Sequence, residues 1–213
     1  MRRLAAVALL ALIATGAALA AKGDPRKHHT AADQAKAKSI VVRLSDLGAG
    51  WTGKKSPNSG GHLHCKGFEP DESALVETGK ANSLDFSKGF QFVTSNAALY
   101  ATAAQAQTAW NLVVRPGLLT CLKALFEQGG SSGGATATVK SQGPLAFPKL
   151  ATRTAAYRIV FQTKSGNQTL SGDLDVVLLG GGRIDTAMLS LSVGAPNTAM
   201  ERHLAGVVAA RIR

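Results

Sequence analysis

Residues 152–193 read TRTAAYRIVFQTKSGNQTLSGDLDVVLLGGGRIDTAMLSLSV. Three segments of this sequence are rich in apolar and β-branched residues: 152–163, 168–179 and 183–193. Ser165-Gly166-Asn167 and Gly180-Gly181-Gly182 separate the segments, and glycine-rich clusters of this kind mark tight turns. The pattern predicts three strands joined as consecutive hairpins, and therefore an antiparallel sheet.

Further extended segments precede this region, and we expect them in the same sheet: 75–86, 89–100 and 136–142. Helices are predicted between and around the strands from capping signatures. Thr30 with Asp33 opens a first helix whose apolar stripe is Ala32, Ala35, Ile40 and Leu44.

Thr102 with Gln105 opens a second helix, which Pro116-Gly117 breaks. A third helix follows over 118–128. Thr198 with Glu201 opens the last helix, after Pro196. Its apolar stripe is Met200, Leu204, Val207, Val208 and Ile212. Hairpins with helices at the start, middle and end predict an α+β fold: a mainly antiparallel β-sheet flanked by helices.

The N-terminus is typical of a signal peptide. Arg2-Arg3 precedes an apolar run from Leu4 to Ala14, and Ala18-Leu19-Ala20 is a small-x-small cleavage site. A permanent anchor is the alternative, but it needs roughly 20 apolar residues to span the bilayer. We therefore expect a signal peptide over 1–20, a polar linker over 21–29 and one α+β domain over 30–213. The protein would then be secreted or held in the cell envelope, and would not span the membrane after cleavage.

Cys65 and Cys121 are the two cysteines of the chain. In an oxidising compartment a lone pair of cysteines most often forms a disulfide. Two buried free thiols are the alternative.

The formal net charge is +11, and removing Arg2 and Arg3 with the signal peptide lowers it to +9. A basic protein attracts anionic polymers, membranes or nucleic acid. The positive charge is partly gathered near the N-terminus and otherwise scattered, with no Lys/Arg run of the kind that marks nucleic-acid binding. Nucleic acid is therefore not an expected partner.

Two glycine-rich matches to ligand motifs lack the required context. Gly48 to Gly53 fits G-x-G-x-x-G, but a dinucleotide site needs a helix directly after it, and Pro57 and Gly60-Gly61 forbid one. Gly129 to Gly133 fits G-x-S-x-G, but it follows a helix, whereas a nucleophile elbow follows a strand. Neither motif predicts a cofactor or a catalytic serine.

Histidines and carboxylates are the candidate metal ligands and catalytic groups of the sequence. His62 and His64 lie beside Cys65, but a zinc site would need that cysteine reduced. His28-His29 lies in the linker, and His203 is expected on the exposed side of the last helix. We expect no metal, no cofactor and no catalytic residue.

Among the carboxylates, Asp173 and Asp175 share one face of a strand and alternate with apolar residues, which predicts a solvated face. Asp71-Glu72 is expected to be a polar turn.

The order of segments resembles a known group. It runs from Ser45-Asp46-Leu47-Gly48-Ala49-Gly50-Trp51, through Cys65, Phe92-Val93-Thr94-Ser95 and Thr102-Ala103-Ala104-Gln105-Ala106, to Glu201-Arg202-His203-Leu204-Ala205. It resembles exported, uncharacterised actinobacterial proteins, which are similar to the extracellular sensor domain of PknH-type receptor kinases and to LpqN-type exported proteins. The resemblance covers roughly residues 31–213 and implies a PsbP-like fold. The kinase sensor domains carry two disulfides, whereas two cysteines allow one here. The resemblance supplies no catalytic residues.

We therefore expect a non-catalytic extracytoplasmic binding or sensor-like domain. Its partner would be a small molecule, a lipid or an envelope component. One alternative is a basic envelope protein that adheres to anionic polymer or lipid headgroups, and a hydrolytic enzyme is a further one. The aromatic residues that could border a binding site are Trp110, Tyr157 and Phe161, although each could simply belong to the core.

Overall fold

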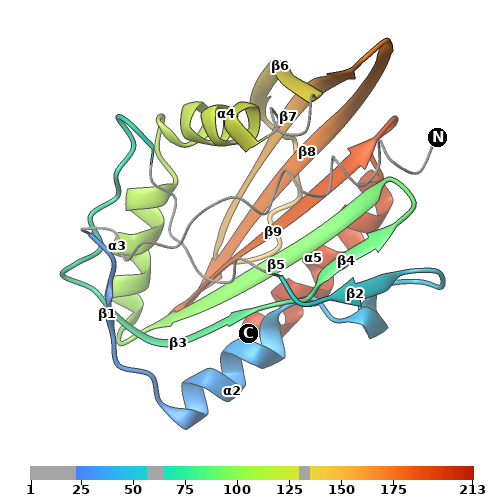
Figure 1. Ribbon diagram of the computed structural model, residues 1–213. Coiled ribbons are helices and arrows are strands. Elements are labelled where there is room, and N and C mark those ends of the chain that lie inside the picture. The colour runs from blue at the N-terminus through green and yellow to red at the C-terminus, as the bar shows by residue number, and fades with distance from the viewer. Residues whose placement is uncertain (1–22, 57–64, 130–134) are drawn as a thin grey trace.

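The computed structural model describes residues 23–56, 65–129 and 135–213. The fold is α+β, as predicted: helices flank one mainly antiparallel sheet (Figure 1). The strands are β1 (Arg26–Lys27), β2 (Thr52–Lys54), β3 (Val76–Asn82), β4 (Asp85–Lys88), β5 (Gln91–Tyr100), β6 (Ala135–Pro144), β7 (Arg153–Ser165), β8 (Gln168–Gly181) and β9 (Ile184–Val193). The helices are α2 (Ala31–Ile40), α3 (Ala103–Val113), α4 (Leu118–Gly129) and α5 (Thr198–Ile212), with a 3₁₀ turn at Leu44–Asp46.

The main path of the sheet runs β1-β3-β5-β9-β8-β7-β6. β4 continues beside β5 where β3 has ended, and β2 pairs with β4. All neighbours are antiparallel except β1 and β3, which pair in parallel. The long strands β5, β9, β8 and β7 therefore form the centre of the sheet, and both of its faces are available for packing.

The hairpin β7-β8-β9 is formed as the sequence predicts. The turns are Gly166-Asn167 and Gly182-Arg183, and both glycines have positive φ, +57° and +51°. A tight hairpin turn of type II′ needs a glycine at its first central position for this reason. The second turn is shorter than expected, because Gly180 and Gly181 belong to β8.

Two helices cover each face of the sheet (Figure 1). α2 and α5 pack on one face over a core that includes Val93, Val177 and Met188. α4 packs on the other face over a second core, where Phe126 and Phe161 stack with ring centroids 4.6 Å apart. α3 lies on this second face, beside α4, and its Ala106 and Ala109 pack against Tyr100.

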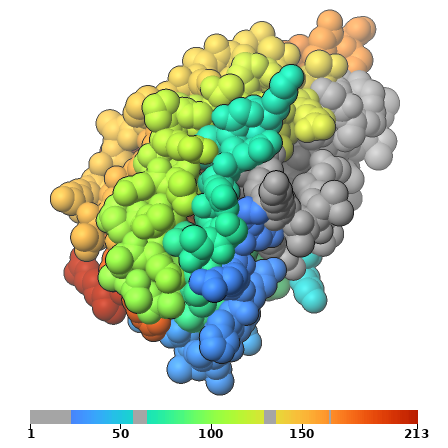
Figure 2. All heavy atoms as spheres, turned by 90° about the vertical axis from the view of Figure 1, so that its left-hand side faces the viewer, coloured from blue at the N-terminus to red at the C-terminus, as the bar shows by residue number. Residues whose placement is uncertain are grey.

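Figure 2 shows α3 beside the segment that leads into β3. The Gln105 side chain accepts a hydrogen bond from the Val76 amide at 2.9 Å and ties the two together.

The register of the first helix differs from the prediction. Thr30 caps α2, as expected, by accepting a hydrogen bond from the Asp33 amide. The buried residues are Ala37 and Ile40, while Ala32 and Ala35 are exposed. α2 crosses β3 so closely that a Cβ on Gly79 would lie 2.5 Å from the Asp33 backbone. This contact sets which side of α2 faces the sheet.

The N-cap of the last helix lies one residue before the predicted cap, Thr198. Asn197 is the N-cap, and its side chain accepts from the Met200 amide, so Thr198 is already helical. Glu201 does not cap the helix. It is 1% exposed and faces the sheet together with Leu204, Val208 and Ile212 of the predicted stripe.

The predicted disulfide is present. Cys65 and Cys121 are bonded, with their Cα atoms 5.4 Å apart. The bond joins α4 to the segment before β3, next to the buried Phe68. Among the described residues, the helices are too short or too polar to cross a membrane.

Candidate ligand pocket

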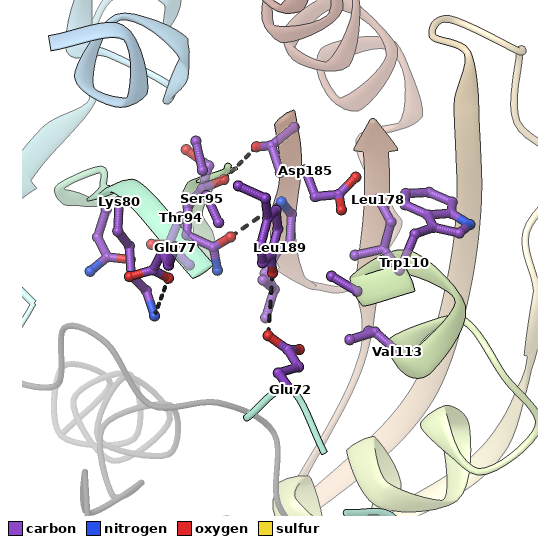
Figure 3. Close-up of a pocket in the computed structure, with 18 of the residues that line it drawn as sticks. Glu72, Glu77, Lys80, Thr94, Ser95, Trp110, Val113, Leu178, Asp185 and Leu189 are labelled. Carbon is purple, nitrogen blue, oxygen red and sulfur yellow. Dashed lines mark hydrogen bonds and ion pairs between the residues drawn. The ribbon is translucent and has the colours of Figure 1, made fainter. Parts of the chain in front are cut away.

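A hollow of about 290 Å³ lies between α3 and the sheet (Figure 3). One wall is apolar: Trp110 and Val113 come from α3, and Leu178 and Leu189 come from β8 and β9. These strand residues share a face because Leu178 pairs with Ala187, two residues from Leu189. Pockets with an apolar wall and a few converging polar groups are typical of small-molecule binding.

A β-bulge brings charge to the opposite end of the pocket. Glu77 pairs with Tyr100 and Gly79 pairs with Leu99, so Thr78 is an extra residue in β3. In regular strand alternation, Glu77 and Lys80 would point to opposite faces. The bulge places both side chains on the pocket face, where the Lys80 ammonium lies 3.6 Å from Glu77 Oε2. Bulges commonly redirect side chains beside functional sites.

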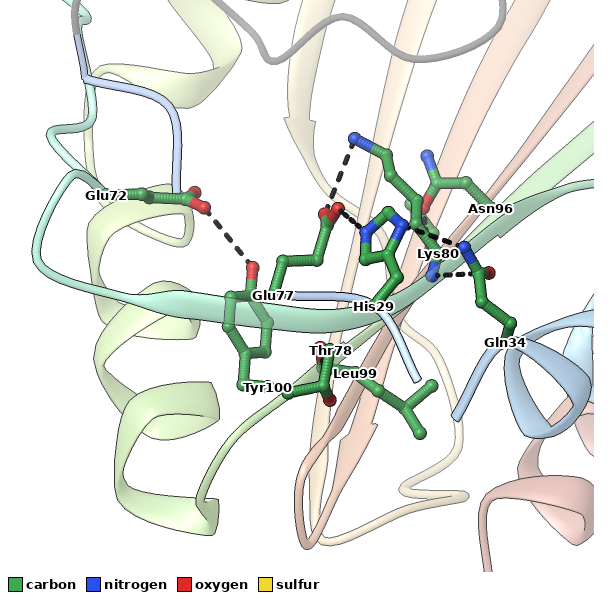
Figure 4. Close-up of polar contacts among 10 residues, drawn as sticks. His29, Gln34, Glu72, Glu77, Thr78, Lys80, Asn96, Leu99 and Tyr100 are labelled. Atoms are coloured by element: carbon green, nitrogen blue, oxygen red, sulfur yellow. Dashed lines mark hydrogen bonds and ion pairs between the residues drawn. The ribbon is translucent and has the colours of Figure 1, made fainter. Parts of the chain in front are cut away.

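The Glu77 side chain is fully buried, and His29 of the N-terminal segment holds it in place (Figure 4). Its Oε1 lies 2.9 Å from His29 Nε2, and His29 Nδ1 lies 2.8 Å from the Gln34 amide nitrogen. His29 is positioned because β1 runs along β3: the His28 amide donates to the Glu77 carbonyl at 2.8 Å. Part of the segment expected as a linker is thus a strand of the sheet and supports the pocket.

A second, half-buried carboxylate reaches the pocket from β9. Asp185 Oδ1 accepts hydrogen bonds from Arg153 at 3.2 Å and 2.9 Å. Arg153 reaches across β8 because residue 180 is glycine; a Cβ there would lie 2.3 Å from Asp185 Oδ1. Burial raises the pKa of Asp185 to about 6. The same guanidinium lies 5.8 Å from the centre of the Trp110 ring.

Glu72 is a third carboxyl group of the pocket and is buried, where a polar turn was expected. It is 2% exposed and accepts a hydrogen bond from the Tyr100 hydroxyl at 3.3 Å. Burial raises the pKa of Glu72 to about 7, and burial also raises the pKa of Tyr100. Asp71 is exposed and accepts a hydrogen bond from the Ser73 amide, as a polar turn implies, whereas Glu72 departs from that expectation because its side chain is buried against Tyr100.

The other predicted residues fall outside this pocket, with one exception. Trp110 lines the pocket, whereas Phe161 is fully buried in the core and Tyr157 packs at the edge of that core. His62 and His64 lie outside the described residues. His203 is exposed, as expected.

No group of three or more metal-binding side chains occurs in the described parts of the chain. Gly48 to Gly53 leads into the strand β2, and most of the second glycine motif is outside the described ranges.

The expectation that Asp173 and Asp175 lie on a solvated face was wrong. Asp175 is 1% exposed, because α5 covers this part of the sheet. Arg158 donates to both oxygens of Asp175, one of them at 2.7 Å, and its Nη2 lies 3.8 Å from Glu201 Oε2. Burial, followed by contact with Asp175, raises the pKa of Glu201 to about 8. These groups form a closed polar cluster beneath α5.

A second hollow, of about 690 Å³, lies at the far end of the opposite face, between α2 and α5. Its apolar floor includes Leu99 and Ile212. Its charged lining residues are Asp33, Lys36, Lys149, Arg183 and Arg213. Arg183 pairs with Asp33 at 2.8 Å, so the remaining charge of this hollow is positive.

Glu77 and Asp185 were not identified from the sequence as residues of a binding site. Glu77 and Asp185 are single carboxylates within strands, and nothing in the local pattern sets them apart. The one available signal was Gly79 inside a predicted strand, because glycine in a strand often marks a bulge. Gly180, taken as part of a turn, was the corresponding signal for the Arg153–Asp185 pair.

Comparison with known proteins adds little to this geometry. No protein-family model matches the sequence, and no curated protein matches it. Among solved structures, the extracellular domain of PknH from Mycobacterium tuberculosis is similar, with 9% sequence identity and a TM-score of 0.45. The match covers 86% of this chain and 98% of that one. The pocket is therefore interpreted from its own residues.

Proposed function

We propose that this protein is a non-catalytic extracytoplasmic binding domain whose ligand occupies the pocket between α3 and the sheet. The observation that carries the proposal is the pocket itself, with an apolar wall from Trp110, Val113 and Leu178 facing buried polar groups. This combination buries a ligand and also orients it.

The engagement of His29, the imidazole nearest the pocket carboxylates, favours binding over catalysis. A general base needs a nitrogen or oxygen that is available to take a proton from the substrate. Both ring nitrogens of His29 are already occupied, by Glu77 and Gln34. Asp185 is paired with Arg153 through Oδ1 alone, and its Oδ2 accepts no hydrogen bond from the described residues. The raised pKa values of Glu72 and Asp185 are the observation that favours an enzyme, and turnover is therefore part of the test.

Export is part of the same proposal. The disulfide Cys65–Cys121 supports an oxidising compartment. We propose that residues 1–20 are removed as a signal peptide and that one domain follows. This domain would begin upstream of residue 30, because β1 belongs to the sheet. A place among exported actinobacterial and LpqN-type proteins rests on the sequence pattern alone.

The experiment compares two tryptophan substitutions on the same helix. Val113→Trp fills the pocket, whereas Asn111→Trp places the same side chain on the exposed side of α3. The exported protein and both variants are screened by NMR against amines, sugars and envelope lipids, and against hydrolase substrates for turnover. Binding that is retained by N111W and lost in V113W supports the proposal. Turnover that is abolished by Asp185→Asn would overturn it.

A second candidate function is adhesion to an anionic polymer or lipid headgroup. The hollow between α2 and α5 favours it, because Lys36, Lys149 and Arg213 line an apolar floor there. Lys149→Glu should abolish such adhesion to vesicles containing phosphatidylglycerol and leave ligand binding in the α3 pocket unchanged. Equal vesicle binding by the wild type and K149E would exclude this candidate.

A further inference from the structure

We propose that the pocket beside α3 takes a small organic cation, an amine with an apolar body. This inference rests on the proposed function and names the class of ligand. The ammonium group would lie between Glu77 and Asp185, and the apolar body would lie on the wall formed by α3 and the sheet.

The first observation is a pair of buried carboxylate oxygens that accept no hydrogen bond within the described part of the chain. Glu77 Oε2 and Asp185 Oδ2 are buried, and neither accepts a hydrogen bond from the described residues. A buried polar atom without a partner destabilises the fold, so native proteins rarely keep one without a reason. Both carboxylates line the same pocket. A ligand with several N–H donors would satisfy both oxygens.

The second observation is that these oxygens are held in place before any ligand arrives. His29 contacts the other oxygen of Glu77 at 2.9 Å, and Arg153 donates to the other oxygen of Asp185. Each carboxylate is therefore anchored through one oxygen and leaves the second for the pocket. Figure 3 shows both side chains among the pocket residues, with Trp110 and Val113 beyond Asp185. Preorganised acceptors reduce the entropic cost of binding.

The third observation is the sign of the local charge. Among the described residues, the charged side chains that line the pocket are Lys80 and four acids: Glu72, Glu77, Asp85 and Asp185. Arg153 pairs with Asp185 and offsets one of these negative charges, as Lys80 offsets another. The chain as a whole carries a net charge of +11. An acidic pocket in a basic protein attracts cations locally and excludes anions, since interaction energies between charges are larger where water is displaced. The Lys80 ammonium lies 3.6 Å from Glu77 Oε2, which is longer than a hydrogen bond, so a ligand N–H group can approach this oxygen more closely.

The test uses three probes that share one apolar body and differ in charge. Phenethylamine is the cation, 2-phenylethanol the neutral analogue and phenylacetate the anion. Each is titrated into ¹⁵N-labelled exported protein while the indole N–H signals of Trp110 and Trp51 are followed. Phenethylamine should shift the Trp110 signal and leave Trp51 unchanged, because Trp51 does not line the pocket. The alcohol should bind about tenfold more weakly, and phenylacetate should not bind.

Two variants test whether the charge of Glu77 is responsible for the affinity for phenethylamine. Glu77→Gln keeps an acceptor for His29 and removes the negative charge, and it should weaken phenethylamine binding about tenfold. Glu127→Gln makes the same change on α4, outside the pocket, and should leave the affinity unchanged. Circular dichroism shows whether each variant is folded. If E77Q does not fold, Asp185→Asn and the probe series on the wild type carry the test.

The possible outcomes separate this inference from the proposed function. The amine preference together with its loss in E77Q supports the inference. Equal binding of the alcohol or of phenylacetate at the Trp110 signal would overturn the cation preference and keep the pocket as a binding site. If no probe shifts Trp110 and the wider screen also finds no ligand sensitive to V113W, both proposals fail.

Discussion

Replacing Glu201 with glutamine should stabilise the protein at neutral and alkaline pH. Glu201 lies on α5 against Asp175, and both are 1% exposed. Its Oε1 accepts from the Ser190 hydroxyl at 3.3 Å, whereas Oε2 accepts no hydrogen bond from the described residues. Oε2 is therefore the natural site of a proton, which it would share with Asp175.

The size of the effect follows from the pKa. Burial and contact with Asp175 raise the pKa of Glu201 from 4.5 to about 8, although Arg158 acts in the opposite direction. Asp173, whose pKa is also raised by burial, is the remaining acid near Arg158.

A carboxyl group with a raised folded-state pKa contributes its full stability below the unfolded pKa and loses it progressively as pH rises from the unfolded to the folded value, here from 4.5 to about 8. Each pH unit costs about 1.4 kcal/mol, so the loss between pH 5 and pH 7 is about 3 kcal/mol.

Glutamine imitates the protonated carboxyl group at all pH values. Its NH₂ donates to Asp175 and its oxygen accepts from Ser190. E201Q and the wild type should therefore unfold at similar urea concentrations at pH 5, and E201Q should be about 3 kcal/mol more stable at pH 7. Urea titrations followed by tryptophan fluorescence at pH 5, 6, 7 and 8 measure this difference. Glu127→Gln is the control, because contact with Lys123 lowers the pKa of that group. Parallel pH profiles for wild type and E201Q would refute the reasoning.

Three further predictions concern the covalent framework, the glycine that admits the Arg153–Asp185 pair, and the pH dependence of binding. The double variant with serine at Cys65 and Cys121 should lose about 4 kcal/mol in denaturant unfolding, as loop-closure entropy predicts for a sequence separation of 56 residues; a loss below about 1 kcal/mol would contradict this. Gly180→Ala should destabilise the protein by about 1–3 kcal/mol, because its Cβ would lie 2.3 Å from Asp185 Oδ1. Gly206→Ala, where nothing lies within 4 Å, should stabilise α5 by up to about 1 kcal/mol; equal melting temperatures for these two variants would show that the close approach at residue 180 is relaxed. Phenethylamine affinity should fall below pH 6, because protonation removes the charge of Asp185; calorimetry that finds constant affinity from pH 8 to pH 5 would argue against this carboxylate as a contact.

The sequence predicted the sheet better than it predicted the site. The hairpins are encoded locally, because a glycine with positive φ is needed at Gly166 and Gly182. The helix caps at Thr30 and Thr102 are equally local, and both are confirmed. The disulfide followed from the number of cysteines and the expected compartment.

The site depends on contacts between distant segments, which local patterns do not encode. Alternation along β8 showed that Asp173 and Asp175 share a face, but it could not show that α5 would cover that face. Glu77 and Lys80 share the pocket face only because of the bulge at Thr78. The anchoring of Glu77 further requires His29, which lies 48 residues earlier in the chain.

The same limit applies to the first helix. Its apolar residues could be placed on a stripe, but the close approach of α2 to Gly79 and the pairing of Asp33 with Arg183 decide which side is buried. Gly79 lies in β3 and Arg183 in the turn between β8 and β9, both distant in sequence from α2, so the register of α2 is a tertiary property.

The most direct test of the binding pocket is a crystal structure of the exported protein soaked with phenethylamine. The ammonium nitrogen should lie within hydrogen-bond distance of Glu77 Oε2 and Asp185 Oδ2, with the phenyl ring against Trp110. A pocket that holds only water bound to both carboxylates, at a phenethylamine concentration that saturates the NMR titration, would contradict the account.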